Sequence, residues 1–111
     1  MIAAKYVECD RDIYAETIVK WGVESQLWMA AEEMGELLQK LSHFIRGRCE
    51  EDAVAEEIAD CFLMLEEMAF VFGREKVVAW IEKKKEVVEQ RLDEKEFRPS
   101  KDIMAENDML D

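Results

Sequence analysis

The chain has 111 residues, half of them hydrophobic, and a net charge of −12, and its length corresponds to one domain. Its acidity argues against nucleic-acid partners and anionic membrane surfaces, because both require basic patches. A nucleotide substrate stays compatible with this charge, since a bound metal ion inverts the local sign. So high a hydrophobic share in a small charged chain favours a homodimer or homotetramer over a monomer with a dense core.

The cysteine and histidine content further narrows the class of protein and the kinds of metal site it can form. Cys9, Cys49 and Cys61 lack metal-ligand spacing, so we expect reduced thiols in a cytoplasmic protein. The longest apolar runs, among them Met68–Phe72, are five residues, and neither a membrane span nor a signal peptide is expected. A single histidine, His43, cannot build a zinc site or a ferritin-like di-iron site.

Composition divides the chain into three parts. We expect an N-terminal arm at 1–9, a helical domain at 10–96 and an acidic C-terminal tail at 97–111, where Pro99 breaks the last helix. Within the central part, four segments show helical apolar periodicity and are separated by glycine-containing breaks. The sequence therefore predicts an all-α fold, an antiparallel bundle of about four helices per protomer that oligomerisation extends into a larger bundle.

The first helix is expected from about residue 11 to residue 20, with Asp10 or Asp12 as its N-cap and Gly22 at its end. Trp21 borders the connection to the second helix. Taken by itself, this side chain is interpreted as an ordinary core tryptophan.

The second helix is expected to start after Ser25 as N-cap and to end at the Arg46-Gly47-Arg48 break. Gln26 and Lys40 share one flank of this helix. Gln26 can hydrogen-bond a base or sugar and Lys40 can meet a phosphate, although both types are more often surface residues. The apolar stripe is close to ideal helical periodicity and comprises Leu27, Ala30, Ala31, Met34, Leu37, Leu38, Leu41 and Ile45.

The third helix is expected at 51–72 and the fourth at 74–94, with Gly73 between them. A short loop before the third helix makes the second and third helices antiparallel neighbours. Lys84 and Arg91 lie beside the stripe of the fourth helix, where they can offset phosphate charge or rest their stems on the core; the choice among Lys83, Lys84 and Lys85 stays open. The stripe expected to be buried on the third helix comprises Val54, Ile58, Cys61, Phe62, Leu65, Met68, Ala69 and Phe72.

An acidic signature occurs twice, so that Glu33 and Glu36 on the second helix correspond to Glu57 and Asp60 on the third. Carboxylates three residues apart lie one turn apart on one face. At about 100° per residue, both pairs flank the apolar stripe on the same side. In antiparallel neighbours the four carboxylates can converge. Glu32 points nearer to solvent. The alternative interpretation is that these acids form an ordinary solvated helix face, and the duplication of the pattern disfavours it.

Converging carboxylates repel one another and lose hydration, and a hard divalent cation is the usual remedy. Mg²⁺ takes oxygen ligands and is typically bound together with substrate phosphates. Mn²⁺ accepts the same ligand type. The acidic signature therefore predicts a Mg²⁺ site, with Mn²⁺ as a substitute.

Glu32-Glu33-x-x-Glu36, followed about twenty residues later by Glu57-x-x-Asp60, resembles the signature of the MazG-like all-α nucleoside triphosphate pyrophosphohydrolases. The resemblance covers roughly residues 10–95 and includes Trp21-Gly22, Gln26-Leu27 and Arg46-Gly47-Arg48.

This resemblance implies cleavage of a (deoxy)nucleoside triphosphate between its α and β phosphates, giving monophosphate and pyrophosphate, with a part in sanitation of the nucleotide pool. It also implies Mg²⁺ held by Glu33, Glu36, Glu57 and Asp60, assembly into dimers or tetramers, an aromatic residue such as Trp21 in the base pocket, and basic residues of the last helix at the phosphates.

In such a site the metal polarises the α-phosphate and activates a water, which Glu33 or Glu32 can orient or deprotonate. One alternative is a non-catalytic helical oligomer that binds nucleotide or a protein partner. Another, within the enzyme class, is a specialist hydrolase acting on dUTP or dCTP rather than a broad one.

Overall fold

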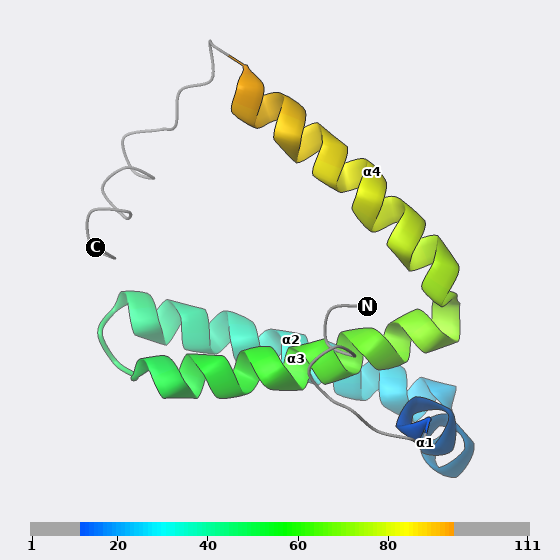
Figure 1. Cartoon of the computed structure of the whole chain (residues 1–111). Coiled ribbons are helices and arrows are strands. Elements are labelled where there is room, and N and C mark those ends of the chain that lie inside the picture. Colours follow the sequence, from blue (N-terminus) through cyan, green and yellow to red (C-terminus); the bar gives the residue numbers. More distant parts are fainter. Residues whose placement is uncertain (1–11, 95–111) are drawn as a thin grey trace. The chain divides into compact units, whose positions relative to one another are not determined.

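The computed structural model describes residues 12–94 (Figure 1). Four helices follow one another: α1 (Ile13–Trp21), α2 (Val23–Ile45), α3 (Glu51–Phe72) and α4 (Arg74–Asp93). The described residues contain no strand, which confirms the predicted all-α class and its four helices. The predicted arm at 1–9 and tail at 97–111 lie outside the described residues.

The helix ends follow from local chemistry. The Asp12 carboxylate caps α1 by accepting from the Ala15 amide at 3.2 Å. Gly22, with φ 86°, ends α1 and directly precedes α2, so Ser25 lies inside α2 and its prediction as the N-cap was wrong. A single glycine in the left-handed region makes the break, and no polar linker is needed.

The α2 and α3 helices form an antiparallel hairpin, joined by the loop 46–50, and lie side by side (Figure 1). Their contact is built from small side chains: among the described residues, Ala30, Cys61 and Ala69 are the buried hydrophobic ones. The Cys61 thiol donates to the Glu33 carbonyl at 3.3 Å, which ties the two helices together beside the acidic signature. Cys61 is thus the small core residue that its position predicted.

Most of the larger residues of the two predicted stripes are exposed, which corrects the expectation that whole stripes are buried. A stripe that runs the length of a helix is wider than one neighbouring helix can cover. Leu38 is 71% exposed and Phe72 is 60% exposed. The exposed members are Leu27, Leu38, Leu41 and Ile45 on α2, and Ile58, Phe62, Leu65 and Phe72 on α3.

The chain divides into two units after Val78, inside α4. The first unit carries α1, α2, α3 and the beginning of α4. In the second, the Trp80 ring lies beneath the ammonium groups of Lys83 and Lys84, 5.3 and 5.9 Å from its centroid. Across residues 12–94, every helix is too short or too polar to span a membrane.

Candidate functional site

Three of the predicted acids meet at the α2–α3 contact. Glu33 and Glu36 from α2 and Glu57 from α3 each offer a carboxylate oxygen, and these oxygens lie within 4.8 Å of one another. Asp60 is not part of this trio, but its charge acts on both Glu33 and Glu57. The neighbouring Glu32 is exposed, in agreement with its expected position nearer to solvent.

Burial and mutual repulsion disfavour ionisation at this cluster. The pKa of Glu33 is raised, first by burial and then by the charges of Glu36, Asp60 and Glu57 together with a side-chain hydrogen bond to Glu36. The pKa of Glu57 is also raised, first by burial and then by Glu36 and Asp60. One oxygen of each, Oε2, is buried without a hydrogen-bond partner. A cation would satisfy both features at once.

Two neighbours modify this cluster. The Lys40 ammonium lowers the pKa of Glu57 and thereby opposes the other charges, so this predicted phosphate contact lies within electrostatic reach of the acids. Burial and the nearby carboxylates raise the pKa of the Cys61 thiol. Burial and these charges therefore disfavour the Cys61 thiolate, and the side chain packs beside the acids.

A cavity of about 460 Å³ adjoins the carboxylates, and Glu33 and Asp60 form part of its wall. Trp21 and Gln26, both predicted substrate contacts, line it as well. The wall comes from α1, α2 and α3 and consists of Ile13, Tyr14, Thr17, Trp21, Ser25, Gln26, Met29, Glu33, Asp60, Leu63, Met64 and Glu67. The acids and the cavity are thus one continuous site.

Helix geometry gives the length of this cavity. On α2, Gln26 and Glu33 are seven residues apart, and on α3 the same separation joins Asp60 to Glu67. Seven residues correspond to two turns, or about 10 Å along each axis. The cavity therefore runs from the carboxylates to a second polar group two turns away, along a wall that includes Met29 and Leu63.

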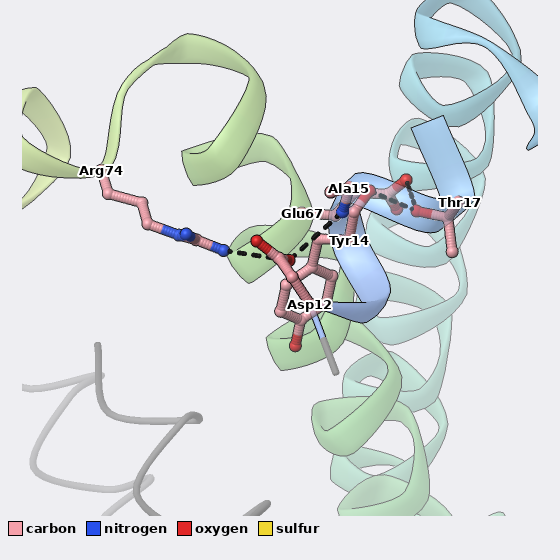
Figure 2. Close-up of polar contacts among 6 residues, drawn as sticks. All are labelled: Asp12, Tyr14, Ala15, Thr17, Glu67 and Arg74. Carbon is pink, nitrogen blue, oxygen red and sulfur yellow. Dashed lines mark hydrogen bonds and ion pairs between the residues drawn. The ribbon is translucent and has the colours of Figure 1, made fainter. Parts of the chain in front are cut away.

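That second group is a buried cluster of Thr17, Gln26 and Glu67, in which Glu67 is 1% and Gln26 4% exposed. The Thr17 hydroxyl lies 2.8 Å from Glu67 Oε1, as Figure 2 shows. Only the nitrogen of the Gln26 amide can donate to a carboxylate, and in that orientation it lies 2.8 Å from Oε1 and 3.0 Å from Oε2 of Glu67. We call these residues the Thr17–Gln26–Glu67 cluster.

Sequence reasoning missed Thr17 and Glu67. Their contact joins residues 50 positions apart, which no local pattern encodes. One signal was present: Glu66 and Glu67 interrupt an apolar helix face between Leu65 and Met68, and both prove to be buried. Buried carboxylates within an apolar stripe require partners, and such positions point to polar networks.

Further polar contacts hold α1 to α3 near this cluster (Figure 2). Arg74, the first residue of α4, pairs with Asp12 at 3.5 Å, as drawn in Figure 2. Its guanidinium also lies over the Phe70 ring. The Tyr14 side chain lies beside Asp12 (Figure 2), and its pKa is raised first by burial and then by the charge of Glu66. The wall that α1 contributes to the cavity is thus fixed by polar contacts with the end of α3.

Lys84 and Arg91 belong to the second unit of the chain, and their role as phosphate contacts stays a prediction. Compared with protein-family models, with curated proteins and with solved structures, the chain matches none of them.

Proposed function

We propose that this protein is a nucleoside triphosphate pyrophosphohydrolase that depends on a divalent cation and cleaves its substrate between the α and β phosphates. The observation that carries the proposal is the continuity of the carboxylates with the cavity, through Glu33 and Asp60. Cation-binding acids beside a mostly apolar cavity with a few polar groups suit a ligand with a polyphosphate end and an aromatic end.

The donor set fits Mg²⁺ or Mn²⁺. Carboxylate oxygens are the ligands that these ions prefer, and Glu33 and Glu57 each hold one buried oxygen without a hydrogen-bond partner. Glu33, Glu36 and Glu57 would hold the ion, with Asp60 as the fourth ligand that the MazG-like motif implies. When bound, the ion would supply charge neutralisation and Lewis-acid polarisation of phosphate oxygens.

The chain's own side chains account for the remaining tasks. Glu33 belongs to both the carboxylates and the cavity wall, a position from which it can accept a proton from an attacking water. Glu32 is exposed and is less suited to that task. Lys40, close enough to lower the pKa of Glu57, offers a positive charge to a phosphate oxygen.

The cavity offers contacts for the base and sugar of the nucleoside. Trp21 offers an aromatic face, while Met29 and Leu63 supply apolar wall. A length of about 10 Å accommodates a base and sugar, with the phosphates at the carboxylate end. The resemblance to the MazG-like family supports the same arrangement.

We also propose that the protein works as a homodimer or homotetramer in the cytoplasm. Leu38, Leu41 and Ile45 are exposed apolar side chains that recur at helical spacing on α2, and apolar surface of this kind is typical of protein interfaces. The same observation favours the second candidate function, a non-catalytic oligomer that binds nucleotide or a protein partner.

Product analysis separates the two. The protein, a panel of NTPs and dNTPs and MgCl₂ should yield pyrophosphate and monophosphate in equal amounts, and EDTA should abolish both. Glu57→Gln should lose turnover by orders of magnitude, while the matched control Glu56→Gln, on the exposed neighbour, should keep it. Absence of turnover on every nucleotide would refute the hydrolase and favour the binding oligomer. Normal turnover by Glu57→Gln would remove Glu57 from the metal site.

A further inference from the structure

The helix α1 supplies one wall of the cavity and yet has little apolar packing of its own. It is nine residues long, and none of its side chains is buried. A helix this short is marginal in water unless tertiary contacts hold it. Because Tyr14, Thr17 and Trp21 all belong to this wall, the contacts that hold α1 in place also set the shape of the cavity.

Polar contacts hold α1, and they differ in strength. Asp12 pairs with Arg74 at 3.5 Å, but both side chains are 46% exposed, and exposed ion pairs contribute little to stability. The Thr17 hydroxyl instead lies 2.8 Å from Oε1 of Glu67, a residue that is almost fully buried (Figure 2). It also lies 2.9 Å from the Tyr14 carbonyl, but its one proton favours the carboxylate. The Thr17–Glu67 contact is therefore the stronger attachment.

Glu67 also joins α2 to this contact. In the orientation that lets it donate, the Gln26 amide nitrogen lies 2.8 Å from Oε1 and 3.0 Å from Oε2 of Glu67. One carboxylate on α3 thus accepts hydrogen bonds from α1 and from α2 at once. Glu67 is 1% exposed, so it presents almost no surface to a ligand and acts through the residues that it holds.

We propose, resting on the proposed function, that Glu67 is a positioning residue for nucleotide binding. By accepting from Thr17 it holds α1 against the hairpin, and it thereby keeps Trp21, about one turn further along α1, at the cavity wall. The clustered acids that would hold the cation all lie on α2 and α3. Glu67 therefore acts on the affinity for nucleotide and leaves the metal site and the chemical step unchanged.

Thr17→Val tests this role, because valine keeps the shape of the side chain and removes the donor. We expect KM to rise by about threefold to tenfold with kcat unchanged, the pattern that follows when uniform binding is lost. The shift in melting temperature caused by Mg²⁺ should keep its wild-type size. Thr17→Ser restores the hydroxyl and is the matched control, which should return KM to the wild-type value.

Two variants of Glu67 test the other partner of this hydrogen bond. Glu67→Gln keeps an oxygen that accepts from Thr17, and the Gln26 amide can turn to accept from the new N–H group, so KM should stay close to the wild-type value. Glu67→Leu removes both acceptor oxygens and should raise KM at least as far as Thr17→Val does. Circular dichroism reports whether each variant folds, and the two Thr17 variants decide the result if Glu67→Leu does not fold.

The outcomes separate this inference from the hydrolase proposal. A wild-type KM in Thr17→Val overturns the role of Glu67 and leaves the hydrolase intact. A fall in kcat or in the Mg²⁺ shift alongside the rise in KM also overturns it, because a general loosening of the fold has that effect. Absence of turnover in the wild type overturns the hydrolase, and calorimetric Kd values for α,β-imido dATP and α,β-imido dUTP with Mg²⁺ then replace KM. Weaker binding by Thr17→Val than by Thr17→Ser supports the positioning role, whereas equal or absent binding overturns it.

Discussion

Replacing Glu57 with glutamine should make the protein more stable without metal and less responsive to Mg²⁺. In the wild type, Glu57 shares a 4.8 Å cluster with Glu33 and Glu36 and has one buried oxygen without a hydrogen-bond partner. An amide of the same shape removes one negative charge from this cluster and relieves the repulsion among the others. The same change removes a charged ligand that the cation would use.

The size of the metal response follows from mass action. Free Mg²⁺ at a hundred times its Kd adds about 2.7 kcal/mol to the free energy of unfolding. For a domain of this size, each 1 kcal/mol raises the melting temperature by about 4–8 °C. The wild type should therefore gain at least about 10 °C at saturating MgCl₂, and Glu57→Gln should lose most of that gain.

The assay is thermal melting monitored by circular dichroism, in EDTA and in a MgCl₂ series at constant ionic strength set with KCl. Constant ionic strength separates a bound ion from general screening. Glu56→Gln is the control, because this exposed residue is adjacent in sequence and carries the same charge. A variant Glu57→Gln that melts no higher than wild type in EDTA and keeps the full Mg²⁺ shift would refute the reasoning.

Three further predictions follow from the structure. In EDTA, stability should be highest below the ordinary carboxylate pKa and should fall as pH rises through the raised pKa values of Glu33 and Glu57. The reason is that both carboxyl groups lose the protonated form that the folded state favours. A melting temperature that rises over this pH interval would contradict the prediction. Thr17→Val should lower the free energy of unfolding by about 1–2 kcal/mol in urea titration, because a hydrogen bond to a buried carboxylate is lost; an unchanged midpoint would argue against that bond. Leu38→Lys should shift the oligomer toward monomer in light scattering, since this exposed side chain is on the proposed interface, and an unchanged mass would place the interface elsewhere.

The helices could be predicted closely because each break carries its own chemical signal. Gly22, Gly47 and Gly73 all adopt positive φ, a conformation that glycine adopts most readily. The predicted bounds of α3 agree with the structure, whereas the start of α2 was placed too late because Ser25 was interpreted as a cap. One strong signal at Gly22 made the weaker one at Ser25 irrelevant.

The positions of the acids could be predicted because both helices of the hairpin carry the same pattern. A single such pattern is common on helix surfaces, whereas two copies place both acid pairs on the same side of the apolar stripes. The polar cluster at the other end of the cavity could not be predicted, since Glu67 contacts Thr17 only when α1 packs on α3. The extent of burial was overestimated for a related reason. Periodicity shows which side of α2 is apolar, but it contains no information on how many neighbours cover that side.

Gly22 is also the single residue that connects the α1 wall of the cavity to α2. The wall residues Tyr14, Thr17 and Trp21 all belong to α1, and that helix is connected to α2 through this one residue. A Cβ at Gly22 would meet no atom within 4 Å, so a larger residue would be opposed by its torsion angles and not by crowding. Rotation about those two torsions would move α1 as a unit and would break its contacts with Arg74 and Glu67. A substitution at this one position would therefore alter the α1 wall and the Thr17 contact with Glu67, while Glu33, Glu36 and Glu57 keep their places on the α2–α3 hairpin.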